Sequence, residues 1–351
     1  MKKLRSALPP TLVLVAMVVM VTVVPVPYVI WSPGQSLDMS GQVRGHPLVE
    51  VEDPGGEDKH TEALTGRILA TSMEQSSPTS PRGLVGLITH YFQGNRTVMP
   101  ADGVHVLGQL PGDSGEARRL EVETSNEQAM AAGAHEAGII VEQWPKIITV
   151  RANGPAHQVL FPGDLIRAID DTPMSTEHDV RLYLRTHKRV GGQAVVSIVR
   201  GEEEIVVTIS KLIGSPSDST VASMGVTVGT GYIYTPEVVF HQDPDLGDLA
   251  QGLPLALTTT MRLAEVDLTH SMVIAAVGRV SADGEITGVP GINEHVQSAH
   301  NGRATVFLMP QENCSDMTIT VPGMLIVPVE TLSQTIDILQ RWGVDSALPT
   351  C

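Results

Sequence analysis

The stretch GPAHQVLFPGDLIRAIDDTPMST, residues 154–176, decides the fold of the middle of the chain. Gly154 and Pro155 predict a turn into a short helix, and Pro162 followed by Gly163 predicts a second turn before a strand. Periodicity around this stretch predicts strands at 138–143, 147–151, 194–200 and 204–211 and a helix at 176–187. These elements indicate a compact α+β unit over residues 138–212, followed by a Gly/Ser/Pro linker at 213–222.

The same stretch resembles the pattern of PDZ domains, in which a Gly-x-Pro-Ala turn is followed by Leu-x-x-Gly-Asp-x-Ile. Gly163, Asp164 and Ile166 match scaffold positions of that pattern. The resemblance implies a β-sandwich or barrel-like domain that grips the C-terminus of an extracytoplasmic peptide or protein by strand addition. It also implies a carboxylate-binding loop just before the first strand, at Ala137, Gly138, Ile139 and Ile140. A PDZ fold retained only as a spacer is the alternative.

Composition excludes several classes of protein. The chain has 351 residues, a formal net charge of −16 and 42% hydrophobic residues, so it can bury a core. The acidic balance argues against nucleic acid as a partner, since phosphates need a basic surface. No G-x-x-x-x-G-K-[ST] stretch occurs, which excludes a P-loop ATPase. Neither a nucleotide nor any other cofactor is predicted.

The first residues predict a membrane anchor. Lys2, Lys3 and Arg5 precede an apolar run that reaches Ile30, which is about the length that a bilayer core requires. The basic flank predicts a cytoplasmic N-terminus, with the bulk of the chain extracytoplasmic at the cell membrane. A cleaved signal peptide is the alternative, but no A-x-A site follows the run.

Two cysteines, Cys314 and Cys351, are too few for a zinc cluster. Outside the cytoplasm they can oxidise, and we expect a disulfide bridge between them. The alternative is a pair of free thiols.

The C-terminal block resembles the proteolytic domain of Lon-type serine peptidases in the tracts VGRVSADGEITGVPGINEHVQSAHNGRATVFLMPQENC, residues 277–314, and GDLAQGLPLAL, residues 247–257. The tract PVPYVIWSPGQSLD, residues 25–38, also resembles the start of membrane-anchored PDZ–Lon proteins. Anchor, PDZ domain and Lon-like domain follow the order of that family. The resemblance implies a mixed α/β domain with a Ser–Lys dyad.

The dyad positions do not match. When Gly252-Leu253 and Ala256-Leu257 are aligned with the Gly-Leu and Ala-Leu of that family, Ala250 falls at the position of the serine. Alignment on Gly291-Ile292 puts His295 at the position of the lysine. Alanine has no nucleophile, and histidine is a base without a hydroxyl to activate. The expectation is a catalytically inactive pseudopeptidase; the alternative is an ATP-independent serine endopeptidase with a divergent site, using Ser271 or Ser298 with His295.

Other candidate sites have simpler explanations. Gly-Asp-Ser-Gly at 112–115 mimics trypsin-like enzymes but lies in a polar loop and is interpreted as a turn. The acids at 243, 245 and 248 lack the glycine and distal glutamate of a calcium loop. The twelve histidines show no H-E-x-x-H or comparable spacing, so no metal site is predicted.

The predicted fold is a multidomain α+β protein that has a transmembrane helix, a PDZ domain and a Lon-like α/β domain. The segments are a cytoplasmic tail at 1–7, the anchor at 8–31, an N-terminal region packing with the core at 32–137, the PDZ domain at 138–212, a linker at 213–222 and the degenerate Lon-like domain at 223–351. The predicted function is a membrane-anchored scaffold or adaptor that binds peptide or protein termini, with enzyme activity left open.

Overall fold

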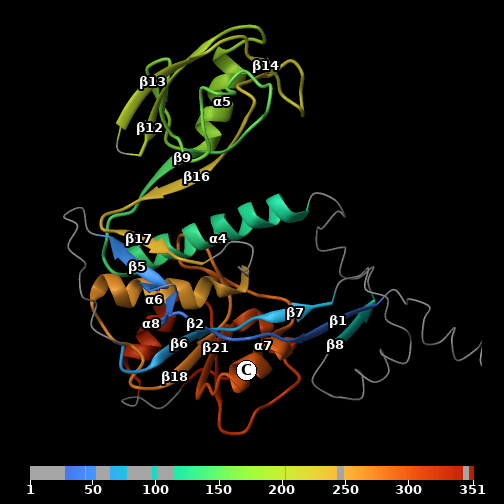
Figure 1. The fold of residues 1–351 in the computed structure, drawn as a ribbon, viewed down its shortest axis with the longest axis vertical. Helices are drawn as coiled ribbons and strands as arrows, with labels where there is room; N and C mark the ends of the chain where they lie inside the picture. The colour runs from blue at the N-terminus through green and yellow to red at the C-terminus, as the bar shows by residue number, and fades with distance from the viewer. Residues whose placement is uncertain are drawn as a thin grey trace, which may run out of the picture. The chain divides into compact units, whose positions relative to one another are not determined.

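The computed structural model describes residues 28–43, 45–52, 64–76, 97–100, 114–201, 203–242, 249–342 and 348–351. The chain divides into two compact units (Figure 1). The smaller unit comprises Val51–Lys59 and Ala134–Val239, and the larger unit comprises Met1–Glu50, His60–Gly133 and Phe240–Cys351. Chain segments far apart in sequence therefore build the larger unit.

The smaller unit is built on one sheet with the strand order β13-β12-β10-β9-β16 and with β11 paired to β10. Its strands are β9 (Glu142–Val150), β10 (Leu165–Ile169), β11 (Thr172–Pro173), β12 (Ala194–Arg200), β13 (Glu203–Ile209) and β16 (Val226–Ile233). A short pair, β14 (Ile213–Gly214) and β15 (Ala222–Ser223), lies beside it in sequence. The predicted strands at 194–200 and 204–211 are confirmed, whereas the two strands expected at 138–143 and 147–151 are the single strand β9.

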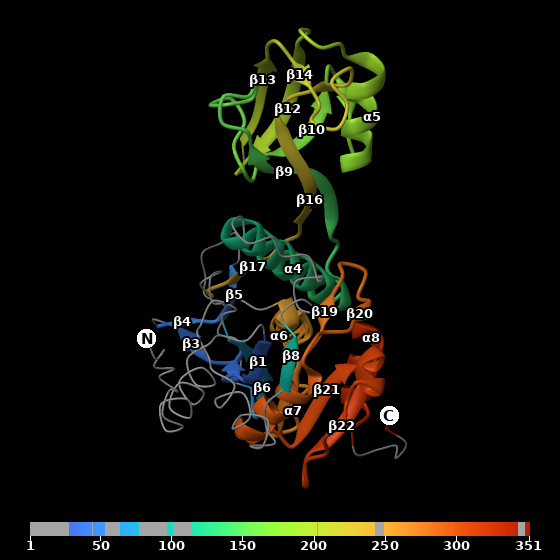
Figure 2. The ribbon, with the colours of Figure 1, turned by 90° about the vertical axis from the view of Figure 1, so that its right-hand side faces the viewer.

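Strand β16 pairs antiparallel with β9 along its whole length, from Val226 opposite Val150 to Ile233 opposite Glu142 (Figure 2). It lies beyond residue 212, where the sequence placed the end of this unit, and yet it is a strand of its sheet. No local pattern in the sequence reports this pairing, because strand pairing is a tertiary property.

Helix α5 (Glu177–His187) forms where the sequence predicts it. Thr176 accepts from the Asp179 backbone N–H while the Asp179 carboxylate accepts from the Thr176 N–H, a reciprocal capping box. Val180 and Leu184 lie one turn apart and are buried. They join Ile147, Ile166, Ile198 and other aliphatic residues in the core of this unit.

The larger unit is built on a five-stranded sheet with the order β2-β6-β18-β21-β22. β18 runs parallel to β6 and β21, and β21 runs parallel to β22. The strands are β2 (Leu37–Asp38), β6 (Arg67–Ala70), β18 (Val273–Ala276), β21 (Val306–Pro310) and β22 (Leu325–Val329). Their apolar side chains are buried, as expected for a parallel sheet covered on its faces.

Four helices accompany this sheet in the sequence: α4 (Ser114–Glu136), α6 (Gly252–Ala264), α7 (Ile292–Asn301) and α8 (Leu332–Gln340). Helix α6 contacts β6, β18 and α8. Gly133 lets α4 approach α6 closely, because a Cβ at this position would lie 2.6 Å from the Ala256 carbonyl oxygen. Thr260 donates to the Gly133 carbonyl at 3.1 Å and fixes this crossing.

Short strands complete the described fold in three groups: β7-β1-β8, β17-β5, and the hairpins β3-β4 and β19-β20. Their bounds are β1 (Tyr28–Pro33), β3 (Gln42–Val43), β4 (His46–Pro47), β5 (Val49–Glu52), β7 (Met73–Gln75), β8 (Thr97–Pro100), β17 (Glu237–Phe240), β19 (Arg279–Val280) and β20 (Ile286–Thr287). Two 3₁₀ turns are η2 (Leu249–Gln251) and η3 (Gln311–Ser315).

The predicted membrane anchor falls almost wholly outside the described residues, since residues 1–27 are not described. Residues 28–31, which the prediction included in the anchor, begin strand β1. Among the helices of the described ranges, none has the length and apolar character needed to cross a bilayer.

The two cysteines pair as expected. Cys314 in η3 and Cys351 at the chain end form a disulfide with a Cα–Cα distance of 5.3 Å. This bond ties the described tail to the segment that follows β21.

Candidate functional site

The open edge of the smaller unit's sheet is the best candidate binding surface. β16 is the last strand in the order, and no other described strand pairs with its second edge. Helix α5 contacts β9, β15 and β16. An edge strand presents unpaired main-chain donors and acceptors, so an extended peptide can add to it as a further strand.

The start of β16 is shaped by Gly225. Its φ of +76° lies in the left-handed region that glycine adopts readily, and a Cβ there would lie 3.0 Å from the Pro155 Cδ. The Gly225 carbonyl accepts from the Arg151 N–H at 2.9 Å, and the Met224 carbonyl accepts from the Ala156 N–H at 3.1 Å. The Gly-Pro-Ala turn and the start of the edge strand are therefore held against one another.

The floor beside this edge is apolar. Val226 and Val228 pack against the core cluster of the unit, whereas Thr227 between them is exposed. The Thr149 hydroxyl donates to the Thr227 hydroxyl at 2.9 Å across the β9–β16 pair. This alternation fixes the strand register, because a slip by one residue would turn Val226 and Val228 out of the core.

The loop predicted to hold a carboxylate, Ala137–Ile140, follows the C-terminal end of α4. The Gly138 N–H donates to the His135 carbonyl and the Ile139 N–H to the Ala134 carbonyl, so these two donors cap the helix. Ile140 is 84% exposed. The strand after this loop is β9, which is already paired with β16 at Glu142–Val150.

The three predicted scaffold residues lie around one ion pair, in which the carboxylate is buried and the guanidinium is partly exposed. Asp164 is 1% exposed and receives two hydrogen bonds from the Arg200 guanidinium, at 2.7 and 2.8 Å, and one from the Phe161 N–H. The hydrogen bond with Asp164 raises the pKa of Arg200 above its ordinary value. Gly163, with φ +96°, makes the turn into β10, and Ile166 is buried in the core.

Comparison with known proteins identifies a PDZ domain in this chain. A family model described as PDZ domain matches residues 120–210. The PDZ domain of the SdrC-like protein of Listeria monocytogenes is 24% identical, covering 24% of this chain and 86% of that one, with a TM-score of 0.22. The PDZ domain of the SdrC-like protein of Listeria innocua is 20% identical. The match covers 24% of this chain and 92% of that one, and its TM-score is 0.22. A solution structure from Geobacillus thermodenitrificans is 28% identical, covering 23% and 92%, at 0.21.

No curated protein sequence matches the chain. The chain contains a PDZ domain, and PDZ domains as a class bind peptide C-termini.

The two positions compared with a Ser–Lys dyad are both buried in the larger unit. Ala250 in η2 is 3% exposed and His295 in α7 is 1% exposed. The His295 Nδ1 lies 3.0 Å from the Thr71 hydroxyl, which follows β6 and is itself 2% exposed. Thr71 was not identified from sequence, because a single threonine 224 residues away carries no local signal of this contact.

The structure also describes the surroundings of the other candidate nucleophiles, Ser298 and Ser271. The Ser298 side chain is fully buried, and its hydroxyl has no hydrogen-bond partner within the described part of the chain. His270 and Ser271 both have positive φ, and the His270 Nε2 contacts the Leu339 carbonyl at 2.7 Å. Of the Gly-Asp-Ser-Gly motif only the backbone from Ser114 onward is described, as the start of α4. The acids at 243, 245 and 248 lie outside the described residues.

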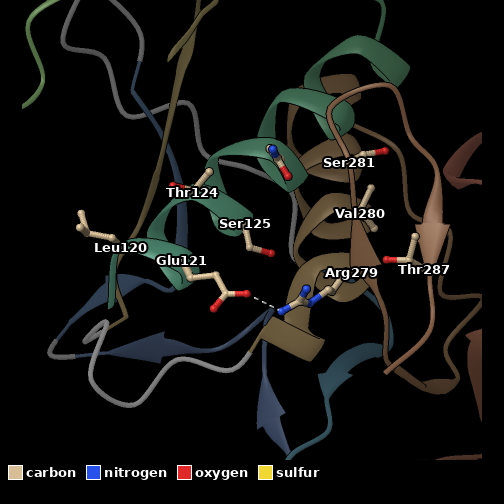
Figure 3. Close-up of a pocket in the computed structure, with 9 residues that line it drawn as sticks. Leu120, Glu121, Thr124, Ser125, Arg279, Val280, Ser281 and Thr287 are labelled. Carbon is tan, nitrogen blue, oxygen red and sulfur yellow. Dashed lines mark hydrogen bonds and ion pairs between the residues drawn. The ribbon is translucent and has the colours of Figure 1, made fainter. Parts of the chain in front are cut away.

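A cleft of about 420 Å³ lies between α4 and the β19–β20 hairpin. Figure 3 shows Glu121 and Ser125 of α4 pointing toward Arg279 of β19. The Arg279 guanidinium donates to the Glu121 carboxylate at 2.8 Å, and both side chains are partly exposed. The pair leaves little net charge in the cleft, so it offers no concentrated site for an anion or a cation.

A third cluster, His46, Glu50 and His241, places three possible metal-ligand atoms within 4.8 Å of one another. Sequence spacing predicted no metal site, because His241 is distant in the chain from the other two residues.

Proposed function

We propose that the protein is a peptide-binding scaffold or adaptor whose PDZ domain receives the C-terminus of a partner protein along β16. The open edge of β16, next to α5 in a sheet of a PDZ domain, carries this proposal. Main-chain hydrogen bonds to the edge would supply affinity, and pockets for alternate side chains would supply specificity. Because Val226 and Val228 make the nearby floor apolar, we propose that the partner ends in an apolar residue.

This proposal moves the carboxylate-binding loop from Ala137–Ile140 to the segment that enters β16. Gly225 begins this segment in a left-handed conformation, and its N–H donates to the Ser223 hydroxyl at 3.1 Å, so a partner's carboxylate would have to compete with that hydroxyl for it. An edge strand can accept another strand only on an unpaired edge, and β9 is occupied by β16 at Glu142–Val150.

The test is a titration of the isotope-labelled full chain with peptides that end in Val, followed by amide shift mapping. We expect shifts on β16 and α5 that disappear when the peptide C-terminus is amidated. Shifts confined to Ala137–Ile140 would show that the earlier placement is right, and no saturable shift with any peptide would refute peptide binding.

A glycine pair provides a matched control. Gly225→Ala introduces strain and a contact with Pro155, and we expect it to weaken binding at least about tenfold. Gly201→Ala introduces the same kind of strain at φ +61° in the β12–β13 turn, where a Cβ would meet nothing within 4 Å. It should bind as the wild type does.

We further propose that the larger unit is a Lon-like domain without peptidase chemistry, serving as a scaffold. Supporting this are Ala250, which has no nucleophile, and the deep burial of His295. A base needs a nucleophile within hydrogen-bond reach that a substrate can approach.

A divergent endopeptidase is the second candidate, and the 3.0 Å contact between Thr71 and His295 favours it, because a hydroxyl beside an imidazole is a nucleophile–base arrangement. The test incubates an unfolded protein substrate with purified wild type, Thr71→Val, His295→Ala and, as a control, the exposed His157→Ala. The scaffold proposal expects no cleavage by any of them. Cleavage by wild type and His157→Ala that is absent in the other two variants would establish the peptidase.

We also propose that the chain is held at the membrane by its N-terminal apolar run, with both units outside the cytoplasm. The basic residues before that run support this orientation, and the Cys314–Cys351 bond suits an oxidising compartment. Membrane-fraction protein that retains Lys2 would agree with it, and a soluble mature form lacking the run would contradict it.

A further inference from the structure

We propose that His46, Glu50 and His241 form a binding site for a divalent transition-metal ion of the zinc type. All three residues belong to the larger unit, and they play no part in the peptide edge of the PDZ domain. The site therefore stands independently of the proposed function.

One carboxylate oxygen lies close to both imidazole rings. The Glu50 Oε2 lies 2.6 Å from the His241 Nε2 and 3.6 Å from the His46 Nδ1. The ring centroids of His46 and His241 are 5.5 Å apart. Ligand atoms bound about 2.0–2.2 Å from a tetrahedral zinc ion are about 3–3.5 Å apart, so small side-chain rotations bring all three into coordination distance.

The backbone around the cluster is held in place. Leu48 and Val49, between the two residues of the N-terminal segment, are each 1% exposed and anchor it in the core. The His241 N–H donates to the Leu48 carbonyl at 2.8 Å, and the Leu48 N–H donates to the Gly41 carbonyl at 2.9 Å. The ligand-bearing segments are thus joined to each other by main-chain bonds before any ion binds.

The donor set selects the class of ion. Two imidazole nitrogens and one carboxylate oxygen suit Zn²⁺, Cu²⁺, Ni²⁺ or Fe²⁺, whereas Ca²⁺ and Mg²⁺ require mostly oxygen ligands. Glu50 and His241 are part-buried, and the His46 side chain is 66% exposed and can adjust its ring. Three protein ligands leave the fourth tetrahedral position to water.

An ion bound here would crosslink the β3–β4 hairpin to the segment that follows β17. Because such an ion binds the folded chain and finds no preformed site in the unfolded one, it raises the unfolding midpoint of the larger unit by mass action. The position open to water distinguishes this site from a closed structural zinc site.

The test titrates Zn²⁺ into chelator-stripped full-chain protein by calorimetry and repeats the titration with Co²⁺, whose visible absorption reports coordination number and geometry. We expect one ion per chain and a higher unfolding midpoint. Affinity should fall by more than about tenfold in His241→Ala, Glu50→Gln and His46→Ala, since even outer-shell partners of a metal are worth 10–100-fold. His300→Ala, an exposed histidine of α7, is the matched control and should bind as the wild type does.

His46→Ala keeps the test decisive, because His46 is exposed and its removal leaves the Glu50–His241 bond intact. Absence of saturable binding by the wild type would overturn the site. Binding that all three variants retain would place the ion elsewhere and would overturn it equally. Binding that is lost in the other two variants but unchanged in His46→Ala would refute the three-ligand centre.

Discussion

The two units present their chemically interesting residues in opposite ways. The PDZ unit leaves β16 with an open edge beside α5, whereas the larger unit buries His295 and Thr71 to 1% and 2% exposure. Binding an extended chain needs only accessible main-chain groups, but peptide hydrolysis needs a nucleophile that substrate can reach. The candidate base of the larger unit is therefore buried, whereas the candidate binding edge of the PDZ unit is unpaired.

The largest expected effect is a loss of stability of the PDZ unit. Arg200→Ala leaves the buried Asp164 carboxylate without its ionic partner, and we expect the PDZ unit to lose about 3 kcal/mol of unfolding free energy. Peptide binding should disappear while the larger unit unfolds at its usual midpoint. Denaturant unfolding of a variant that keeps Trp144 in β9 as its single tryptophan reports the PDZ unit by fluorescence, and far-ultraviolet circular dichroism reports both units.

The control for this experiment is Arg181→Ala, which removes an exposed ion pair with Glu177 on α5. It should cost no more than about 0.5 kcal/mol. Equal losses in both variants would mean that burial of Asp164 contributes nothing special.

The next largest effect concerns the stability of the larger unit. Replacing both Cys314 and Cys351 by serine removes a bond that spans 37 residues, and we expect the larger unit to lose about 2–4 kcal/mol. Peptide affinity should stay at the wild-type value, because the bond lies outside the PDZ unit. Thermal unfolding with and without reductant measures the loss. A fall in peptide affinity would show that the units are coupled.

The smallest effect concerns acid. Burial opposes ionisation of Asp267, but hydrogen bonds from Thr269 and Thr65 outweigh it and lower its pKa to about 2. Because the folded-state pKa lies below the ordinary 3.8, this stabilisation is present above about pH 4 and is lost as pH falls toward 2.

Asp267→Asn should therefore destabilise the larger unit by about 1 kcal/mol at pH 6, allowing for solvent screening, and the difference from wild type should vanish near pH 2. Acid unfolding of both proteins measures it, with the surface pair variant Asp337→Asn as control. A difference that persists at pH 2 would assign the effect to lost packing rather than to charge.

Local signals in the sequence predicted elements well. Periodicity predicted α5, in which Val180 and Leu184 form the apolar stripe, and it also predicted β12 and β13. Such signals extend over one helical turn or one strand, so they specify elements and not partners.

Contacts between distant segments could not be predicted in this way. The pairing of β16 with β9, the Thr71–His295 contact and the contact of His241 with Glu50 each join segments that lie far apart in the sequence. No periodicity or spacing rule reports them, because they arise when the completed sheets bring the segments together. The candidate sites depend on these contacts, whereas the type of each element does not.

The division of the chain has a consequence for the order of events during synthesis. β6 at Arg67–Ala70 pairs with β18 at Val273–Ala276, so a ribosome must deliver the whole PDZ unit before the larger unit can complete its sheet. The PDZ unit contains all strands of its own sheet by Ile233, and folding it brings Glu142 and Ile233 opposite each other. This shortens the loop that the larger unit must close and lowers its entropy cost by on the order of 0.5 kcal/mol. The inserted PDZ unit can therefore fold before the larger unit completes its sheet, and its folding leaves a shorter loop to close.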